Sequence, residues 1–504
     1  MKIEIMDTTL RDGEQTSGVS FTAVEKLNMA KLLLKEAKID RVEVASAKVS
    51  DGEFTAVKRI AEWAAKNHCL DKVEVLGFID GTQSIDWIAS SGAKVVNMLS
   101  KGSMKHLKGQ LRKSPNEHIA DIKATLNYAT GLGLKANIYL EDWSNGMRNS
   151  RDYVFCLLDA IIDEPFQRFM LPDTLGILNP DETYEFCKMV VDRYPGKHFD
   201  FHAHNDYDLA VANVLASVKT GIKGIHTTVN GLGERSGNAA LSSVIAVLRD
   251  HGQVELGLNE HKINMVSKIV ESFSGIRIPS NKPIIGENVF TQTCGVHADG
   301  DSKDKLYFND LLPERFGRVR KYALGKTAGK SNIMQNLKEL GIELDHEVMK
   351  QVTKRVIELG DRKENVTTED LPYIISDILN SEVMEQKIKI KNYSLSLTEG
   401  LKPVASVSVE IGKKVYQETA SGDGQYDAFM KAIQKIYKSL KMKLPKLIDY
   451  VVTIPPGGKT DALVETIITW NNGREFKTRG LDSDQAVAAI QATLKMMNIM
   501  ENGK

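Results

Sequence analysis

The sequence predicts an α/β protein whose N-terminal half is a (β/α)8 TIM barrel. Short β-leaning runs alternate with stretches that carry apolar residues at three- and four-residue spacings, such as Ala23–Ala37 and Ile119–Gly131. Eight such units in about 250 residues are typical of this barrel. A doubly wound sheet is the alternative, although its usual Gly-rich turn after the first strand is missing. The predicted strands are Ile3–Thr8, Arg41–Ser46, Val73–Phe78, Val95–Ser100, Lys135–Glu141, Arg168–Thr174, His198–His204 and Gly224–Asn230.

Polar side chains gather at the ends of these predicted strands. In a TIM barrel the active site lies at the C-terminal ends of the strands, so we expect these side chains to meet at one rim. Random placement of polar residues would seldom produce this pattern. The residues are Arg11 and Asp12 after the first strand, Glu141 and Thr174 at the ends of the fifth and sixth, His202 and His204 at the end of the seventh, and Asn230 at the end of the eighth.

The pair His202 and His204 is the most informative feature of the chain. Strand side chains alternate with a period of two, so both imidazoles are expected on one face. Two imidazoles suit a divalent metal such as zinc, manganese or iron, and Asp12 is the obvious carboxylate to join them. Such a set leaves coordination positions open for a substrate and water, as catalysis requires. The alternative is a half-buried strand with incidental histidines, and the rim pattern favours the metal site over it.

The composition predicts a soluble, cytoplasmic protein of two or three domains. Lys and Arg together number 66, as do Asp and Glu, which gives no electrostatic reason to expect nucleic acid or an anionic membrane as a partner. The four cysteines are scattered without a C-x-x-C pair, so neither a disulfide framework nor a zinc ribbon is indicated. No run approaches the roughly 18 apolar residues of a membrane span, and no cleavable apolar segment is expected at the N-terminus.

After the predicted catalytic domain (residues 1–250), the pattern changes to helices and irregular connections over residues 251–385. His297 is unusual in this linker region because it lies among Gly and Asp rather than on an apolar face. A solvated loop histidine is its alternative interpretation. Gly325–Lys330 superficially resembles a phosphate loop but lacks the required spacing.

Residues 386–504 read as a β-β-β-α unit repeated twice, which predicts a separate α+β module. Asp423 and Asp427 before one helix, with Asp482 and Asp484 before the other, are expected to be equivalent helix caps. No catalytic constellation lies here, so effector binding or assembly is indicated. The expected strands are Lys387–Leu397, Ala405–Ile411, Lys414–Glu418, Leu447–Ile454, Ala462–Trp470 and Arg474–Thr478, and the helices are Gln425–Leu440 and Asp484–Met497.

Four long motifs, in the same order, resemble those of the metal-dependent acyl-CoA Claisen condensing enzymes. That family comprises the 2-isopropylmalate, citramalate and homocitrate synthases. The tail is similar to the family's allosteric module, so the resemblance covers nearly the whole chain. The motifs are Asp7-Thr-Thr-Leu-Arg-Asp-Gly-Glu-Gln15, His202-Ala-His-Asn-Asp206, Asn230-Gly-Leu-Gly-Glu-Arg-Ser-Gly-Asn238 and Gly295-Val-His-Ala-Asp-Gly300.

The resemblance implies a role for each candidate residue. Asp12, His202 and His204 would hold a zinc, manganese, magnesium or cobalt ion, with Asn238 close to it. Arg11 would supply positive charge where an alkoxide develops. Thr174 would hydrogen-bond the carboxylate of a 2-oxo acid. The base that removes a proton from acetyl-CoA would involve a histidine of the partner subunit, which makes His297 the candidate, assisted by Glu141 and accompanied by Tyr307. A homodimer with active sites completed in trans is therefore expected.

The predicted 2-oxo acid is pyruvate. Leu76, Leu99 and Tyr139 take inward positions on the third to fifth strands, where they would admit a methyl group but crowd an isopropyl group. 2-Isopropylmalate synthases usually carry a serine where Tyr139 stands. The product would be (R)-citramalate, an intermediate of isoleucine biosynthesis, with isoleucine as effector. A 2-isopropylmalate synthase that uses 2-oxoisovalerate for leucine biosynthesis, with leucine as effector, is the alternative.

Three other interpretations of the sequence are less favoured. A homocitrate synthase would need a polar group for a distal carboxylate, and none is apparent. A metabolite sensor with an inactive barrel is disfavoured by the intact set Arg11, Asp12, Glu141, His202, His204 and His297. Aldolase or carboxyltransferase domains share the barrel and its H-x-H ligands, but not this linker and tail together.

Overall fold

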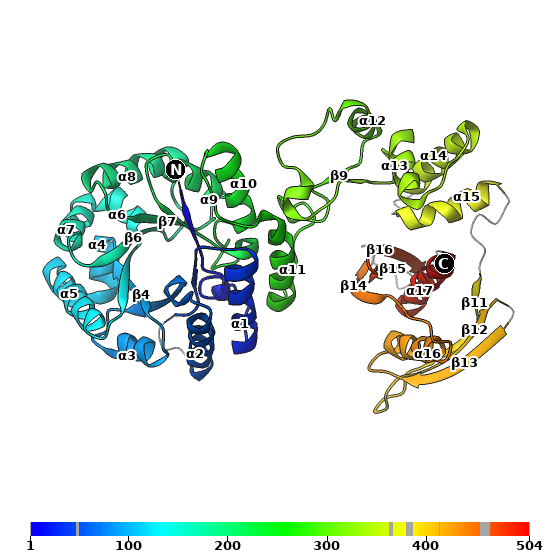
Figure 1. The fold of residues 1–504 in the computed structure, drawn as a ribbon, viewed down its shortest axis with the longest axis horizontal. Coiled ribbons are helices and arrows are strands. Elements are labelled where there is room, and N and C mark those ends of the chain that lie inside the picture. The colour runs from blue at the N-terminus through cyan, green and yellow to red at the C-terminus, as the bar shows by residue number, and fades with distance from the viewer. Residues whose placement is uncertain are drawn as a thin grey trace. The chain divides into compact units, whose positions relative to one another are not determined.

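The computed structural model of the chain describes residues 2–46, 50–361, 366–379, 387–412, 414–453 and 464–502. It divides into two compact units (Figure 1). The barrel unit comprises residues Met1–Phe290 and Phe308–Arg320, and the C-terminal unit comprises Thr291–Tyr307 and Lys321–Lys504. Within the described ranges, no helix combines the length and the apolar character needed to cross a membrane.

Eight parallel strands form a closed barrel in chain order, which confirms the predicted (β/α)8 fold and excludes an open doubly wound sheet. The eighth strand closes the barrel against the first, with Ile225 beside Ile5. The strands are β1 (Glu4–Asp7), β2 (Arg41–Glu43), β3 (Val73–Phe78), β4 (Val95–Lys101), β5 (Lys135–Glu141), β6 (Phe166–Asp173), β7 (Phe199–Ala203) and β8 (Gly224–Thr227). Residues at every second position face the same side, so each strand presents a short column of side chains to the interior.

Two strands end three residues before their predicted ends. The strand expected over Arg41–Ser46 ends at Glu43, and the one expected over Gly224–Asn230 ends at Thr227. Asn230 has a left-handed backbone (φ 60°) inside a 3-10 turn, which a strand does not permit. Its side-chain amide donates to the Ser267 carbonyl at 3.0 Å, so Asn230 anchors a loop rather than ending a strand.

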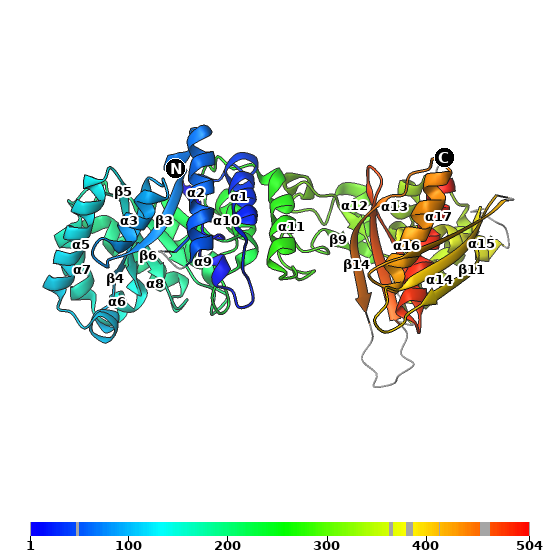
Figure 2. The ribbon, with the colours of Figure 1, turned by 90° about the horizontal axis from the view of Figure 1, so that it is seen from below.

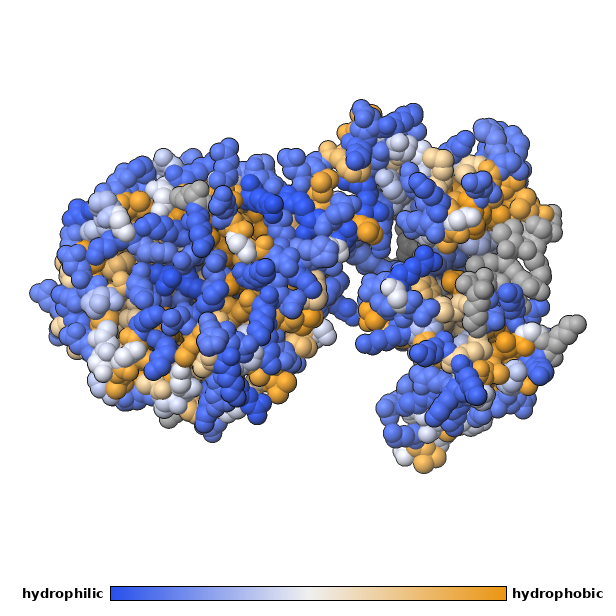
Figure 3. Space-filling view, in the orientation of Figure 1, coloured by the Kyte–Doolittle hydropathy of each residue, from blue (hydrophilic) through white to orange (hydrophobic). Residues whose placement is uncertain are grey.

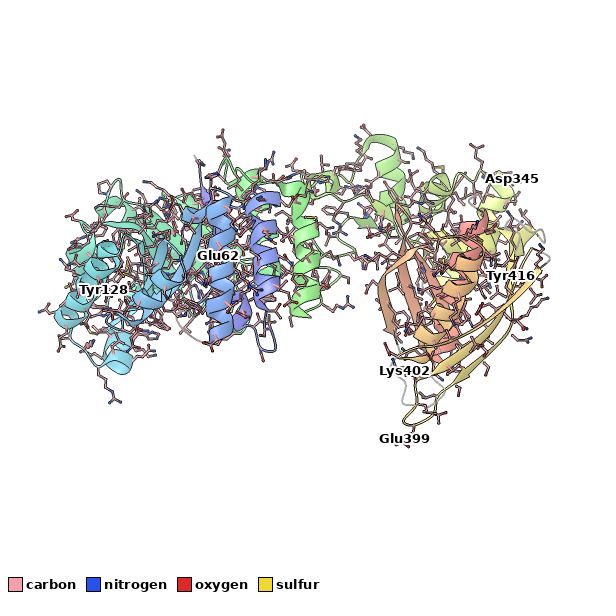
Figure 4. All side chains as sticks on the ribbon, turned by 60° about the horizontal axis from the view of Figure 1, so that its bottom comes forward. Glu62, Tyr128, Asp345, Glu399, Lys402 and Tyr416 are labelled. Atoms are coloured by element: carbon pink, nitrogen blue, oxygen red, sulfur yellow. The ribbon has the colours of Figure 1, made fainter. Side chains whose placement is uncertain are left out.

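Helices surround the barrel, and local sequence signals explain where several begin. Thr22, Ser114 and Asn179 each start a helix with a capping box, completed by a glutamate three residues later. Tyr128 of α5, labelled in Figure 4, donates to Asp86 of α3 at 2.6 Å and ties two neighbouring helices together. The main helices are α1 (Ala23–Lys31), α2 (Asp51–Lys66), α3 (Gln83–Ser90), α5 (Pro115–Gly131), α7 (Arg151–Ile161), α8 (Pro180–Arg193), α9 (Ala210–Val218), α10 (Leu241–His251) and α11 (Ile263–Ser274).

Most apolar side chains of the barrel unit enter one buried core between strands and helices. The face of this unit seen in Figure 3 is largely hydrophilic, with hydrophobic residues scattered over it. Such scattered residues are normal for a protein surface and indicate no docking site.

The first part of the C-terminal unit is helical and has a small core of its own. Strands β9 (Thr291–Gln292) and β10 (Lys321–Tyr322) pair in parallel. The segment around His297, expected to be irregular, is the helix α12 (Gly295–Asp304). Helices α13 (Lys330–Leu340), α14 (His346–Asp361) and α15 (Leu371–Leu379) follow.

The rest of the unit is the predicted (βββα)2 module. Two three-stranded antiparallel sheets share one apolar core with helices α16 and α17, and Figure 2 shows both halves. Each half has a register shift in its first strand, between Ile390 and Asn392 and between Leu447 and Asp449, as expected of a repeat. The elements are β11 (Ile388–Ser396), β12 (Val404–Ile411), β13 (Lys414–Ser421), α16 (Gln425–Ser439), β14 (Lys446–Thr453), β15 (Val464–Asn471), β16 (Glu475–Asp482) and α17 (Gln485–Asn502). Ile454, Ala462 and the boundary at Gln386 lie outside the described residues.

The two helices of the module are not capped equivalently, contrary to the prediction. Asp484 caps α17 by accepting hydrogen bonds from the backbone N–H groups of Ala486 and Val487, at 2.8 and 3.0 Å. Helix α16 instead begins after Gly424, which has no side chain to cap it. Asp427 reaches back to the N–H of Asp423 at 2.8 Å, which fixes the turn before this helix.

Candidate active site

Asp12, His202 and His204 converge at the C-terminal rim of the barrel. Their donor atoms lie within 4.8 Å of one another, and all three side chains are buried. Asp12 Oδ2 is 3.2 Å from His202 Nε2 and 3.8 Å from His204 Nε2. The N–H of Asp12 donates to the Thr8 carbonyl at 2.8 Å, which turns the chain inward after β1. The structure thus brings Asp12 to two histidines that lie almost 200 positions later in the sequence.

The charge states of this donor set fit a metal ion. Burial lowers the pKa of His202 and lowers that of His204 to about 4, so both imidazoles are neutral. Burial opposes ionisation of Asp12, but the Arg11 guanidinium and the interactions with His202 and His204 together outweigh it and hold the pKa of Asp12 well below its usual range. One carboxylate and two neutral imidazoles are the forms in which these groups bind a divalent metal.

Asn238 supplies another oxygen beside the histidines. Its backbone forms a β-bridge with His204, and its amide donates to the Leu232 carbonyl at 3.0 Å. That bond fixes the amide, while Asn238 Oδ1 and Asp12 Oδ1 are buried without a hydrogen-bond partner in the described part of the chain. Buried oxygens are normally satisfied, so these two acceptors are consistent with a cation as their partner.

Arg11 is fixed beside the donor set by three contacts. Its Nε donates to Glu43 at 2.7 Å, its Nη1 lies 3.3 Å from Asp12 Oδ2, and its Nη2 donates to the Tyr139 hydroxyl at 3.3 Å. These bonds orient the planar guanidinium before any substrate arrives. A fixed, partly buried positive charge of this kind can stabilise an oxyanion without reorganisation.

Leu76, Leu99 and Tyr139, predicted as the acceptor wall, lie together in one apolar cluster with Met6 and Met170. The strand register explains this contact, because Leu99 on β4 stands beside Tyr139 on β5, which stands beside Met170 on β6. The Tyr139 ring is 2% exposed. The cluster therefore forms a stiff apolar surface next to Arg11.

Thr174 follows β6 at the same rim. Its hydroxyl oxygen accepts the N–H of Asp142 at 2.9 Å, which leaves the hydroxyl hydrogen for another acceptor. Arg235 donates to the Thr174 carbonyl at 2.8 Å and forms an ion pair with Asp206 at 2.7 Å. Arg235 therefore joins the loop after β6 to the loop after β7.

Glu141 forms an ion pair with Lys101, a residue that the sequence analysis did not single out. Lys101 occupies the position two after Leu99 at the end of β4, so the strand period places both on the interior face. Alternation along β4 is the signal that could have found it. Both charged groups line a pocket of about 400 Å³ together with Phe78, Ile79, Asp80, Leu99, Gln110, Leu111 and His118.

His297 and Tyr307 belong to the C-terminal unit and pair with each other. Their ring centroids are 4.2 Å apart, with His297 in the first turn of α12 rather than in a loop. A side chain at Gly300 would come within 2.6 Å of the Tyr307 ring, so glycine is needed there for the ring to pack over the helix. The two residues thus form one polar aromatic unit.

Known protein families match nearly the whole length of this chain. The HMGL-like family matches residues 2–270, the homocitrate synthase post-HMGL domain-like family residues 284–364, and the LeuA allosteric (dimerisation) domain residues 365–501.

A putative (R)-citramalate synthase of Methanopyrus kandleri is 33% identical over 503 residues, covering 99% of this chain and 96% of that protein. A probable 2-isopropylmalate synthase of the same organism is 34% identical over 502 residues, covering 99% and 98%. An (R)-citramalate synthase of Methanocaldococcus jannaschii is 31% identical over 506 residues, covering all of both chains. Overall identity does not separate the two activities.

Proposed function

Because the chain belongs to the HMGL-like family, we propose that it is an acyltransferase that condenses acetyl-CoA with a 2-oxo acid. The preferred acceptor is pyruvate, the products are (R)-citramalate and CoA, and the reaction belongs to isoleucine biosynthesis. The observation that carries this choice is the stiff apolar wall of Leu76, Leu99 and Tyr139 beside the donor set. The second candidate is a 2-isopropylmalate synthase, which the relatives of that name support equally by identity.

The residues that would hold the divalent metal are Asp12, His202 and His204, with Asn238 Oδ1 as a further oxygen. When bound there, manganese, zinc, magnesium or cobalt supplies a Lewis acid that polarises the ketone of the acceptor. The neutral imidazoles and the ionised Asp12 are ready for this role at neutral pH.

The chain's own side chains would orient the acceptor. The free hydroxyl hydrogen of Thr174 would donate to the acceptor carboxylate. The Arg11 guanidinium would stabilise the negative charge that develops on the ketone oxygen. The methyl group of pyruvate would then face Leu99 and Tyr139.

Acetyl-CoA would use the pocket lined by Leu99, Lys101 and Glu141. The segment from Lys101 to Lys113 also contributes Gln110 and Leu111 to this pocket, and it carries five basic and no acidic residues. Such a run suits the phosphate groups of CoA, whose charge it would offset. The thioester end would lie near Glu141.

A base must remove one proton from the acetyl methyl group. We assign this role to His297 of the partner subunit, with Tyr307 packed against its ring and Glu141 assisting. The resulting carbanion forms a carbon–carbon bond with the ketone carbon, and the ketone oxygen gains a proton. Water then cleaves the thioester, which releases the CoA thiol and leaves a carboxylate.

The proposed homodimer has a direct test by subunit mixing. Arg11→Ala and His297→Ala chains should each be inactive alone. In a one-to-one mixture at exchange equilibrium, half of the dimers are mixed and each has one intact site, so about a quarter of wild-type activity should return. Absence of recovery in proven heterodimers would show that each chain works alone.

The C-terminal module would carry feedback control. It matches the LeuA allosteric (dimerisation) domain and joins two similar halves, with the Tyr426 hydroxyl 2.7 Å from that of Thr493 between α16 and α17. We propose isoleucine as the effector, or leucine for the second candidate function. Binding of neither amino acid to the full-length chain would refute this assignment.

The function is tested by measuring release of the CoA thiol with pyruvate and 2-oxoisovalerate side by side. A higher kcat/KM with pyruvate is expected. A preference for 2-oxoisovalerate would favour the second candidate, and no thiol release with either acid would favour a metabolite sensor.

A further inference from the structure

The Tyr139 hydroxyl is buried at a point where three polar side chains meet. It lies 3.3 Å from Arg11 Nη2, 3.3 Å from Glu43 Oε2 and 3.1 Å from His226 Nδ1. His226 is on β8, across the barrel interior from β5, and is 1% exposed. Its other nitrogen, Nε2, lies 3.1 Å from Asp200 Oδ2.

The number of available hydrogens decides how these contacts are made. Asp200 forms an ion pair with the Arg41 guanidinium, so its carboxylate acts as an acceptor. His226 Nε2 therefore carries the hydrogen and donates to Asp200. In this tautomer the ring nitrogen Nδ1 carries no hydrogen and is an acceptor. Nδ1 can only receive the hydrogen of the Tyr139 hydroxyl.

This assignment leaves every partner satisfied. The Tyr139 oxygen accepts from Arg11 Nη2 while its hydrogen goes to His226. Glu43 Oε2 accepts from Arg11 Nε at 2.7 Å, so it does not need the tyrosine hydrogen. The result is one directed chain of hydrogen bonds, Arg11 to Tyr139 to His226 to Asp200.

The far end of this chain is anchored firmly. Arg41 donates to Asp200 Oδ2 at 2.6 Å. A side chain at Gly224 would lie 1.9 Å from Asp200 Oδ1, so glycine at the start of β8 makes the space that the carboxylate occupies. Because Asp200 cannot move, it fixes His226, whose ring also packs against His202 with centroids 5.4 Å apart.

We propose that His226 and Asp200 are positioning residues that set acceptor specificity by holding the Tyr139 ring against Leu99 and Arg11. The inference rests on the proposed function and extends it to residues that do not touch the substrate. Without the bond from His226, the Tyr139 hydroxyl would turn toward Glu43, and the ring and the guanidinium would shift together. The wall would then no longer exclude a branched acceptor.

The test compares His226→Gln, Tyr139→Phe and the double variant in the full-length, metal-loaded protein. Each single variant should raise the kcat/KM for 2-oxoisovalerate relative to pyruvate by roughly tenfold, the low end of what a hydrophobic pocket discriminates. The two effects should not add, because both remove the same hydrogen bond. His198→Gln is the matched control, since His198 lies 3.0 Å from the other oxygen of Asp200 but, among the described residues, forms no hydrogen bond with Tyr139.

The outcomes distinguish failure of the positioning role from failure of the proposed function. Unchanged selectivity in Tyr139→Phe, or fully additive effects in the double variant, would overturn the positioning role even if His226→Gln failed to fold. A wild-type protein that releases no CoA thiol with either acid would overturn the proposed function and this inference with it.

Discussion

Two groups of charged side chains inside the barrel differ in how their charges are paired. Near the N-terminal ends of the strands, Glu4, Glu74 and Asp200 surround the Arg41 guanidinium at 3.2, 3.0 and 2.6 Å. The chain supplies the cation for these carboxylates itself. Removing one partner from such a buried charge group is costly, because it leaves an uncompensated buried charge.

At the C-terminal rim, Asp12, His202 and His204 also converge, but here two neutral imidazoles face a carboxylate. Arg11 contacts Asp12 from one side only, and Asp12 Oδ1 and Asn238 Oδ1 have no hydrogen-bond partner in the portion of the chain described. The paired group of buried charges therefore holds the fold together, whereas the rim group, with acceptor oxygens and nitrogens left over, is suited to bind a cation from outside.

Breaking the rim group should have the largest effect on activity. We expect Asp12→Asn to weaken metal binding and condensation by more than about a hundredfold, because loss of a residue that only hydrogen-bonds a metal ligand already costs about 10–100-fold. Metal content by mass spectrometry and thiol release would measure this. His251→Ala, an exposed histidine in the last turn of α10, is the control. Wild-type metal content and turnover in Asp12→Asn would show that Asp12 is not a ligand.

Opening the wall beside the rim should change selectivity rather than turnover alone. Tyr139→Ser removes the buried ring, and Leu99→Ala removes its neighbour in the register. Both should raise the kcat/KM for 2-oxoisovalerate relative to pyruvate by about 10- to 200-fold. An unchanged ratio in both variants would show that these residues do not line the acceptor site.

Breaking the paired group should affect stability instead. Glu74→Gln removes one partner of the buried Arg41 and should lower the free energy of unfolding by about 3 kcal/mol. Metal content per folded chain should be unchanged, because this group binds nothing from outside. Chemical denaturation together with metal analysis would test both statements. Loss of metal at wild-type stability would contradict a purely structural role for the Arg41 group.

Asp7 sharpens this comparison because it is a buried carboxyl with no ion-pair partner among the described residues. Burial raises its pKa to about 7, and its Oδ2 has no hydrogen-bond partner within the described residues. A carboxyl whose pKa is higher in the folded protein than in the unfolded chain stabilises the fold at low pH, and this contribution is lost as the pH rises through about 7. Between pH 5 and 8 the loss amounts to roughly 2–3 kcal/mol.

Asp7→Asn removes this titration, so its melting temperature should fall less than that of the wild type between pH 5 and 8, by a few degrees. Thermal melts of both proteins at the two pH values measure the difference. Parallel pH dependence would show that Asp7 is ionised in the folded protein.

Much of the barrel was predictable because its signals are local. Periodicity located the eight strands, and capping boxes at Ser114 and Asn179 mark helix starts that the sequence states directly. The end of β8 was missed because Asn230 adopts a left-handed conformation that apolar periodicity does not report. The equivalence of the two Asp pairs failed because Gly424, not an aspartate, begins α16.

The rim was predictable for a different reason. Parallel strands bring their C-terminal ends to one edge, so residues such as Asp12 and His204 must meet wherever they lie in the chain. Strand alternation could have identified Lys101, which lies two residues after Leu99, whereas the importance of His226 comes from its partner Tyr139 on another strand. Such pairings depend on register, which composition and motif spacing do not contain.

Direct metal titration of the full-length chain tests the central claim most simply. Metal-free protein titrated with Mn²⁺ should bind one ion per chain, and this binding should disappear in His202→Ala but persist in Glu74→Gln. Thiol release with pyruvate should rise in proportion to the bound ion. Full thiol release by protein verified to be metal-free, or undiminished Mn²⁺ binding in His202→Ala, would contradict the account.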